Sequence, residues 1–524
     1  MHVRHLEEHY DALAHHFLEG NDLLKALEYA LKAGDRAYTL STWERASYHY
    51  ELALELLGEL PEDLPHRAEV LRRLAELESL LGRQGLRHTH AALDLYSKLG
   101  EKTKAARMHC LIGSGWFSGL AGAPNKERGV SHFAAAVKLL EADPDSAEKA
   151  ASWSWFAFAR VFGSLDHEQG VRYGKQSLEI AERLNDLDEV AKACADFGAA
   201  LFLQGELTQA RQYAERSWET ALQGKDPWVK ARNAIWPIGV WPWSNDRAWM
   251  ERWLARYSEY RQRSRLERYD RALWGLTALF SALSGRPQEA AEALRRADEF
   301  ASLHPYLHPF WAYIAGAAHA VLGDDEQASG LLVQGLRAAE SGDVTGQFVE
   351  ASTYYGRFLL ATGDSITAEA VLTKAYALAH DKESIPQELT LLPLLCELHI
   401  ATGRLQEAEQ CLERARVLLA QPQPWRGLTA SVDLAAGLWA TAKGDWPAAE
   451  SAFARARETE RLYGFPYGEA RVLLEWGEMY LKRDSSGDRE QGMTLLDEAL
   501  ALFQRIQARR MVEKILARKE MLAA

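Results

Sequence analysis

Hydrophobic and small residues recur along the chain at the spacing of a helix with one buried face. Ala368, Leu372 and Ala375, for example, lie four and then three residues apart. This spacing places all three side chains on the same side of a helix. Runs in which apolar and polar residues alternate between turn residues, as in a β-strand, are nearly absent. The pattern therefore predicts an all-α fold.

The helical pattern repeats with a period near 40 residues. The segments ATGDSITAEAVLTKA, ATGRLQEAEQCLERA and AKGDWPAAESAFARA each place a glycine five residues before an alanine, with a second alanine seven residues later. The same frame fits upstream, and its glycines are Gly205, Gly285, Gly323, Gly363, Gly403 and Gly444. Successive glycines are 38 to 41 residues apart, except for 80 residues between the first two, where we expect one degenerate unit.

Each position of the repeat has a physical reason. The glycine ends a first helix because it tolerates a left-handed backbone. Small residues such as Gly356 and Ala368 let two helices approach closely, and a larger residue such as Leu372 fills the contact. One helical pair cannot bury its own apolar face, so neighbouring pairs must stack into a continuous core. The period thus predicts an α-solenoid of roughly 12–13 helical pairs.

This pattern resembles the tetratricopeptide repeat, in a long form of about forty residues. The resemblance covers nearly the whole chain and is strongest in residues 190–500. It divides the chain into N-terminal helical repeats at 1–60, a superhelix at 61–500 and a C-terminal capping helix at 501–524. An irregular, tryptophan-rich unit is expected at 226–264.

Composition and charge limit the classes of function. The net charge of −13 argues against nucleic-acid binding, which needs a basic face. No run approaches the roughly 18 apolar residues of a membrane-spanning helix, and the charged first residues do not resemble a signal peptide. The four cysteines lie far apart, without metal-ligand or disulfide spacing. We expect a soluble, cytoplasmic protein that binds neither nucleic acid nor membrane.

The N-terminal segment has a narrower resemblance. It is similar to the segment that follows the nucleotide-binding core in bacterial signalling ATPases, such as the maltose regulator and cyclases fused to an ATPase. The resembling stretches are LAHHF at 13–17, ALEY at 26–29, AGDRA at 33–37 and residues 46–57. In that family the superhelix senses an inducer or a protein. This sequence contains no G-x-x-x-x-G-K-[ST] loop, so the resemblance implies the sensor role without ATP hydrolysis.

Three stretches resemble chemical motifs. HLEEH at 5–9 matches an inverted zinc-protease motif, but no downstream acidic ligand can be identified. GSGWFSG at 113–119 resembles a dinucleotide-binding loop, but it lacks the third glycine and no strand precedes it. The absence of both features favours a loosely packed helix or a turn. SLHPYLHPFW at 302–311 is interpreted as the start of a helix rather than a metal site. We therefore expect a non-catalytic protein without a metal or cofactor.

The segment WPIGVWPWSNDRAWMERW, residues 236–253, holds five of the seventeen tryptophans. Pro237 and Pro242 should kink or end its first helix, in which Trp241 is expected to fill a core position. The second helix carries one aromatic stripe: Trp249, Trp253, Tyr257 and Tyr260. Interleaved arginines could make this stripe a recognition surface or could shield core rings with their stems. Aromatic stripes at helical spacing are more often core, which favours packing.

First helices line the inner groove of tetratricopeptide arrays, so the repeat frame predicts which side chains face inward. In the middle units these positions are small or aromatic, which favours an apolar or sugar-like ligand or an inserted peptide. Tight superhelical winding would also demand small residues there. The candidate groove residues are Trp155, Phe162, Phe202, Arg232, Trp236, Trp243, Phe310, Tyr313 and Arg357.

The repeat and the N-terminal resemblance together predict a non-catalytic sensor or interaction module for signal transduction or transcriptional regulation. It would bind a small-molecule inducer or a protein or peptide partner in its groove, and a signalling ATPase or cyclase is an expected partner. A constitutive protein-binding scaffold is the alternative. An enzyme with an unrecognised site near residues 236–253 has less support, because the sequence offers arginines there but no paired base and nucleophile.

Overall fold

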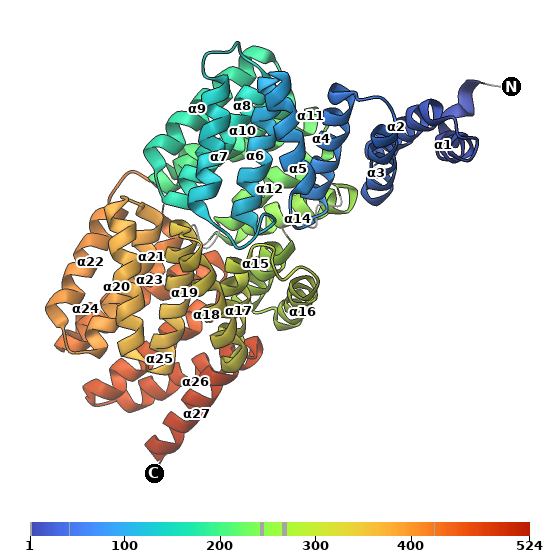
Figure 1. Ribbon diagram of the computed structural model, residues 1–524. Helices are drawn as coiled ribbons and strands as arrows, with labels where there is room; N and C mark the ends of the chain where they lie inside the picture. The colour runs from blue at the N-terminus through green and yellow to red at the C-terminus, as the bar shows by residue number, and fades with distance from the viewer. Residues whose placement is uncertain (1–2, 41, 241–245, 265–269, 424, 524) are drawn as a thin grey trace.

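The computed structural model describes residues 3–40, 42–240, 246–264, 270–423 and 425–523 (Figure 1). Within these ranges the regular structure consists of 26 α-helices, with short 3-10 and π segments and no β-strand. The helices form twelve antiparallel pairs, from α2/α3 to α25/α26, and α1 and α27 flank them at the two ends. This architecture confirms the predicted α-solenoid.

The bounds of the helices in the first half are α1 (Tyr10–Glu19), α2 (Leu23–Thr39), α3 (Trp43–Glu59), α4 (Leu64–Leu80), α5 (Arg87–Leu99), α6 (Lys102–Ser118), α7 (Lys126–Leu140), α8 (Ala147–Phe158), α9 (His167–Leu184), α10 (Leu187–Gln204), α11 (Leu207–Gln223) and α12 (Pro227–Gly239). Those of the second half are α14 (Arg247–Ser264), α15 (Asp270–Leu283), α16 (Pro287–Leu303), α17 (Ala312–Leu322), α18 (Asp325–Ser341), α19 (Thr345–Thr362), α20 (Ser365–Asp381), α21 (Ile385–Ala401), α22 (Leu405–Leu419), α23 (Thr429–Lys443), α24 (Trp446–Tyr463), α25 (Pro466–Arg483), α26 (Asp488–Ile506) and α27 (Arg509–Ala523). Shorter segments are η1 (Val3–His9), η2 (Ala159–Gly163), η3 (Pro309–Trp311) and η4 (Arg426–Leu428).

The small residues of one helix in a pair pack against the large residues of the other, as the repeat predicts. A Cβ at Gly356 of α19 would lie 2.5 Å from Leu372 Cγ of α20, and one at Gly437 of α23 would lie 2.6 Å from Phe453 Cε1 of α24. Both partner side chains are fully buried. Gly363, which ends α19, has a φ of +87°, in the region that favours glycine. In these two pairs, therefore, a bulky side chain packs directly against the backbone of the partner helix.

Successive turns of the superhelix lie against each other. Helices α4 to α12 form one turn, and α15 to α25 form the next, which stacks beneath it in Figure 1. Residues about 215 positions apart meet along the seam, a separation of between five and six repeats. The contacts are Lys126 N to Gly342 O at 2.9 Å, Thr208 N to Gln423 Oε1 at 3.1 Å, Arg247 Nη1 to Gly464 O at 3.1 Å, and His167 with the Lys382 carbonyl. Along this seam the two turns of the superhelix are therefore in direct contact.

The aromatic stripe of α14 belongs to the core. Trp249, Trp253 and Tyr257 are buried against α12, α15 and their neighbours, so the packing interpretation holds for this helix. The Arg256 guanidinium lies 4.4 Å from the Trp253 ring centroid, which is the shielding arrangement expected from interleaved arginines. The preceding helix, α12, includes Pro237 and ends at Gly239. The predictions for Trp241, Pro242 and Trp243 fall outside the described residues.

The segment GSGWFSG is more tightly packed than the sequence predicts. Residues 113–118 form the last part of α6, and Gly119 ends the helix with a φ of +92°. A Cβ at Gly113 would lie 2.8 Å from Phe133 Cε1, and Gly115 lies against Leu86. The prediction of loose packing is therefore wrong, because these glycines permit close contact with α7 and with the residue that precedes α5. The SLHPYLHPFW segment joins α16 to η3 and α17, as expected for the start of a helix.

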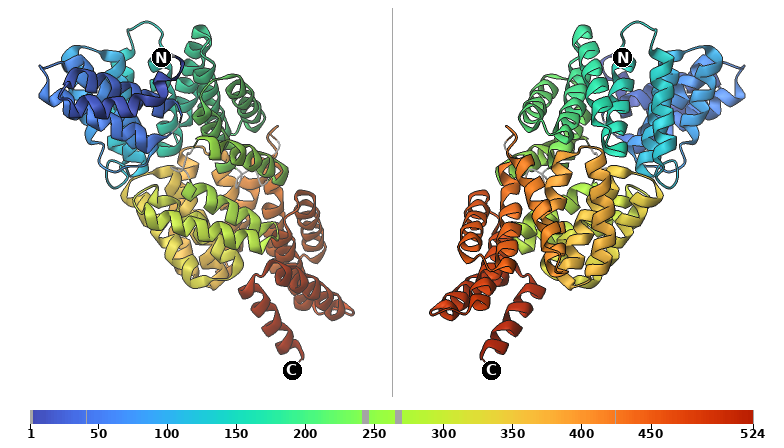
Figure 2. Two further views of the ribbon diagram at one scale, coloured as in Figure 1. Left: turned by 90° about the vertical axis from the view of Figure 1, so that its right-hand side faces the viewer. Right: turned by 90° about the vertical axis from the view of Figure 1, so that its left-hand side faces the viewer.

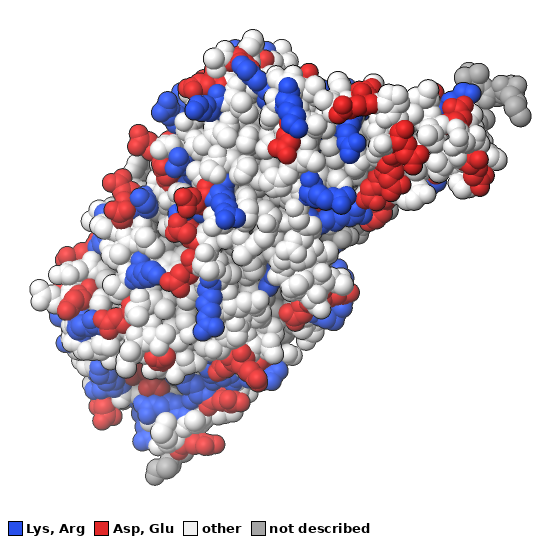
Figure 3. Space-filling model, viewed as in Figure 1, with Lys and Arg blue, Asp and Glu red and all other residues white. Residues whose placement is uncertain are grey.

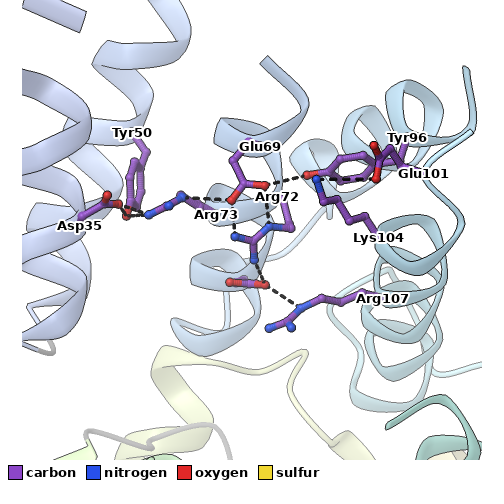
Figure 4. Close-up of polar contacts among 10 residues, drawn as sticks. Asp35, Tyr50, Glu69, Arg72, Arg73, Tyr96, Glu101, Lys104 and Arg107 are labelled. Atoms are coloured by element: carbon purple, nitrogen blue, oxygen red, sulfur yellow. Dashed lines mark hydrogen bonds and ion pairs between the residues drawn. The ribbon is translucent and has the colours of Figure 1, made fainter. Parts of the chain in front are cut away.

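Helices α1 to α3 project from one side of the body, and α27 lies at the opposite end (Figures 1 and 2). A polar network joins this N-terminal arm to α4 (Figure 4). The Tyr50 hydroxyl donates to Asp35 Oδ1 at 2.6 Å, and Arg73 Nη1 donates to the same hydroxyl at 2.9 Å. Val70 and Leu74 of α4 complete the contact with an apolar cluster. The arm is therefore attached through one short interface.

A row of cavities as the candidate functional site

Six of the nine predicted groove residues line one cavity of about 160 Å³ between the two turns. They come from α8, η2, α12, η3 and α17. We call this cavity the aromatic chamber, and the six residues are Trp155, Phe162, Arg232, Trp236, Phe310 and Tyr313. The repeat frame thus selected residues that are far apart in the sequence and adjacent in space.

A break in helical geometry gives the chamber one of its walls. At its C-terminal end α8 passes into η2, a π-helical segment that carries Phe162. Short π segments occur often at functional sites. Trp155 of α8, seven residues before Phe162, stacks on Phe133 at a centroid distance of 5.9 Å, which fixes its ring plane. Gly346 of α19 lies against the Phe162 carbonyl and brings the second turn close to this wall.

A buried ion pair forms the polar side of the chamber. Arg232 Nη2 of α12 donates to both carboxylate oxygens of Asp196 on α10, at 2.7 and 2.9 Å. Ser154 also donates to Asp196. A buried carboxylate is costly unless it is paired and hydrogen-bonded, and these contacts meet both conditions. Sequence reasoning did not select Asp196, although it is the one charged residue in the run ACADFGAALF, which would have marked it.

Glu350 of α19 lies at the boundary between the aromatic chamber and a second cavity, because it lines both. Its side chain is buried, and this burial raises its pKa to about 8. The hydroxyl of Tyr313, which hydrogen-bonds Glu350 and lies 3.2 Å from Gln347 Oε1, opposes that shift without cancelling it. At neutral pH this carboxyl is therefore mostly protonated.

The second cavity, of about 130 Å³, carries charged groups inside the second turn. We call it the arginine chamber. Its charged and hydroxyl-bearing lining residues are Glu350, Thr353, Tyr354, Arg357, Thr390, Glu397, Ser431, Glu460, Tyr467 and Arg471. Arg471 Nη2 of α25 pairs with Glu397 of α21 at 3.2 Å. Arg357, by contrast, makes neither an ion pair nor a hydrogen bond with any residue that the structure describes.

The surroundings of Arg357 oppose its positive charge. Arg357 is exposed within the arginine chamber. Partial desolvation by the chamber walls, and then the neighbouring charge of Arg471, lower its pKa. Glu460 of α24 faces the same cavity, with its carboxyl against Gly468. Burial raises the pKa of Glu460 to about 7. The arginine chamber thus combines one paired and one unpaired guanidinium with two carboxyl groups whose pKa burial raises, to about 8 for Glu350 and about 7 for Glu460.

The two chambers belong to a row of four adjoining cavities. A cavity of about 450 Å³ lined mainly by α4, α6 and α8 shares Trp155 and Arg232 with the aromatic chamber. A cavity of about 170 Å³ that reaches Arg510 and Lys514 shares Arg357 and Arg471 with the arginine chamber. The row forms a channel along the inner side of the superhelix.

On the outside, charges of both signs are interspersed over the face shown in Figure 3.

Three predicted residues do not belong to the aromatic chamber. Arg357 lines the arginine chamber instead. Trp243 falls outside the described residues. Phe202 is buried in the core and packs edge-on against Trp425 at 5.6 Å, so its assignment to the groove is wrong. The repeat frame fails at Phe202 because the second turn covers that end of α10, a contact between distant residues that a local repeat cannot reveal.

Among the described residues there is no group of three side chains suited to a metal ion. None of the described helices has the length and hydropathy needed to cross a membrane.

Comparisons with known proteins bear on the fold. No family model and no curated protein matches the sequence. The crystal structure of the APC/C hetero-tetramer Cut9-Hcn1 matches with 16% identity over 97% of this chain and 96% of that one, at a TM-score of 0.52. Yeast Tom70 (13%, 94% and 99%, 0.35) and a Rap protein complexed with competence and sporulation factor (14%, 84% and 98%, 0.28) align less closely. The chain folds as a tetratricopeptide-like superhelix. At this level of identity the likeness shows the fold alone, and the similarity to ATPase sensor segments stays a prediction.

Proposed function

We propose that this protein is a non-catalytic sensor module that takes up its ligand in the aromatic chamber. The observation that carries the proposal is the convergence of Trp155, Phe162, Arg232 and Trp236 on one cavity. Ligand sites in proteins are typically concave and apolar, with a few placed polar groups. The ion pair between Asp196 and Arg232 supplies such groups.

The volume of the chamber suits a small apolar group. An engineered apolar cavity of about 150 Å³ accepts benzene. The aromatic chamber, at about 160 Å³, therefore has room for one aromatic ring or a short branched alkyl group. A larger ligand would extend into the adjoining cavities of the channel.

The position of the chamber favours sensing over constitutive binding. Trp155, Phe162 and Trp236 belong to the first turn of the superhelix, whereas Phe310 and Tyr313 belong to the second. A ligand that contacts both turns adds its binding free energy to their association. Ligand binding is then coupled to the packing of the two turns, which is the requirement for a conformational signal.

The N-terminal arm is the proposed output surface. Its helices carry the segments that resemble the junction of signalling ATPases, and they project from the body (Figure 1). Leu24, Leu40 and Tyr48 are each more than 60% exposed on the arm. We therefore propose a signalling ATPase or cyclase as the protein partner, bound through α1 to α3.

Gly239 offers a direct test of the ligand site. It lines the aromatic chamber, and a Cβ added there would meet no atom of the described residues within 4 Å. Gly239→Leu should therefore fill the chamber without a clash. Gly330→Leu is the matched control, because Gly330 is an exposed helical glycine on α18 with equally open surroundings.

The experiment is native mass spectrometry of the two variants and the wild type, each purified gently from the host of this protein. We expect a bound small molecule on the wild type and on Gly330→Leu, and its loss from Gly239→Leu. A ligand retained by Gly239→Leu would place the site elsewhere and overturn the proposal. A stoichiometric protein partner, with no small molecule on any of the three chains, would favour a constitutive scaffold.

A further inference from the structure

Among the described residues, Glu350 is the acidic side chain of the aromatic chamber that has no counter-ion. It lies on α19, is 7% exposed, and lines the chamber together with Asp196 and Arg232. Arg232 pairs with Asp196, so these two charges compensate each other. Glu350 forms no ion pair with any residue that the structure describes, and it accepts a hydrogen bond from the neutral hydroxyl of Tyr313. When Glu350 is ionised, the chamber therefore carries one uncompensated negative charge.

An uncompensated carboxylate at this position is costly. Moving a carboxylate out of water is unfavourable unless a cation or several hydrogen-bond donors replace the water. Asp196 has such a cation, because both of its carboxylate oxygens accept from Arg232. Arg357 and Arg471 of the adjoining cavity do not compensate Glu350, since neither forms an ion pair with it. A cationic group of a ligand in the aromatic chamber would compensate this charge.

The walls of the aromatic chamber suit an organic cation. Eight Phe, Trp and Tyr side chains line it: Phe117, Trp155, Phe158, Phe162, Trp236, Phe310, Trp311 and Tyr313. The face of an aromatic ring attracts a cation, and groups of such rings bind alkylated ammonium groups. Arg232 already makes a contact of this kind, with its guanidinium carbon 6.0 Å from the Trp155 ring centroid. The combination of a buried carboxyl group and several aromatic rings therefore favours an ammonium group.

Helix α19 presents Glu350 to the chamber as part of one helical face. Val344, Gln347 and Glu350 are spaced three residues apart, and all three line the chamber. The cavity of about 160 Å³ has room for a short branched alkyl group. A trimethylammonium group has the shape of a tert-butyl group, so the charge adds no bulk. The chamber can therefore hold such a cation within its observed volume.

We propose that the ligand of the aromatic chamber carries a small alkylated ammonium group, held by the aromatic rings and by the carboxylate of Glu350. This inference rests on the proposed function, because it assigns a chemical class to the ligand of that same site. It commits to a small organic cation and not to a basic segment of a protein.

Binding of such a cation should strengthen as pH rises. Burial raises the pKa of Glu350 to about 8, so the carboxylate that attracts the ligand forms around this pH. A quaternary ammonium group does not titrate, and its affinity should rise by at most about 10-fold per pH unit, the limit for one titrating group. The other titratable and charged groups that line the same cavities are Asp196 on α10, Arg232 on α12, His308, Tyr313 on α17, Tyr354 and Arg357 on α19, Glu397 on α21, Glu460 on α24, and Tyr467 and Arg471 on α25. Of these, Glu460 has a pKa of about 7, so loss of the pH dependence in Glu350→Gln is needed to assign it to Glu350.

The experiment measures binding of choline and of 3,3-dimethyl-1-butanol to the full chain by isothermal titration calorimetry at pH 8.5. The alcohol is the matched probe because it has carbon in place of the charged nitrogen of choline and is otherwise the same molecule. We expect the wild type to bind choline more tightly than the alcohol. Glu350→Gln should weaken choline binding about 10- to 100-fold, the effect of two unit charges about 6 Å apart at an effective dielectric constant of about 20 to 40, and leave the alcohol unchanged.

Two further variants serve as controls. Glu326→Gln, at an exposed glutamate of α18, should bind both probes as the wild type does. Glu350→Asp retains the carboxylate and should retain the preference for choline, which separates the loss of charge from a general disturbance of the chamber. A preference for choline that persists in Glu350→Gln would overturn the inference.

Gly239→Leu separates this inference from the proposed function. If choline and the alcohol bind equally, and only Gly239→Leu weakens both, the aromatic chamber is a ligand site and the ammonium assignment is wrong. If the wild type binds neither probe but retains a co-purified ligand that Gly239→Leu loses, the proposed function stands and the ligand class is wrong. Choline binding that is insensitive to both Glu350→Gln and Gly239→Leu would overturn the inference, and a co-purified ligand retained by Gly239→Leu would overturn the proposed function with it.

Discussion

The contact between Gly356 and Leu372 lets the packing rule of the repeat be tested by adding one methyl group. Gly356→Ala would place a Cβ 2.5 Å from Leu372 Cγ, closer than carbon atoms pack, and the crowded atom is near the base of the leucine side chain. Leu372 would have to change its rotamer, or α19 and α20 would have to separate. Overpacking of this kind costs about 1–3 kcal/mol.

An opposing effect must be subtracted from this cost. Alanine is better than glycine in the middle of a helix by about 1 kcal/mol. The net result for Gly356→Ala is a destabilisation between 0 and about 2 kcal/mol. Gly330→Ala on α18 has the same helical gain without the clash, because nothing lies within 4 Å of its Cβ position. The difference between the two variants isolates the clash, and we expect about 1–3 kcal/mol.

The suitable assay is hydrogen exchange of the amides in α18, α19 and α20, followed by mass spectrometry. Repeat arrays can unfold in steps, so a local free energy of opening is more informative than one global midpoint. The double variant Gly356→Ala with Leu372→Ala should be less unstable than the sum of the two single variants, because the added methyl group enters the space left by the leucine. Equal protection in Gly356→Ala and Gly330→Ala would refute the packing rule.

Two further predictions concern buried residues near the channel. The pKa of Glu350 is about 8 in the folded protein, above its ordinary value of 4.5. Between these two pH values the folded state therefore binds more protons than the unfolded state. The free energy of unfolding should fall as pH rises through this range. Glu350→Gln should remove that part of the pH dependence, as measured by thermal unfolding between pH 5 and 8.5; an unchanged slope would contradict the assignment. Trp253→Ala should destabilise the protein by about 3–5 kcal/mol in urea unfolding, since the ring is fully buried. Trp253 lines none of the four cavities of the channel, so loss of bound ligand from the folded variant would count against its purely structural role.

The sequence predicts the parts of the fold that depend on local spacing. The positions of Gly356, Gly363 and Leu372 determine a helical pair, and the period repeats that pair along the chain. The chamber residues Trp155 and Tyr313 were found because inward positions follow the same frame. Local spacing carries no information on which turn will cover which helix. For that reason Phe202, which Trp425 covers, was misassigned.

The polar groups of the channel were harder to predict for a different reason. Asp196 and Glu350 are isolated acidic residues within helices. The apolar run around Asp196 indicates that this acid is enclosed, but the sequence does not identify the partner of either residue. Their roles depend on Arg232 and Tyr313, which lie 36 and 37 residues away along the chain. The ion pair and the raised pKa of Glu350 follow only from three-dimensional contacts.

The seam between the turns also restricts how this protein can change in length. In an open solenoid each repeat touches only its neighbours, so a whole repeat can be gained or lost with a local effect. Here Lys126 meets Gly342, and Thr208 meets Gln423, at a separation of 215 or 216 residues. Removing one 40-residue unit between them would shift every later contact of the seam by one helical pair. Duplication and deletion of repeats, the common route by which such arrays diversify, should therefore be tolerated only at the two ends of this chain.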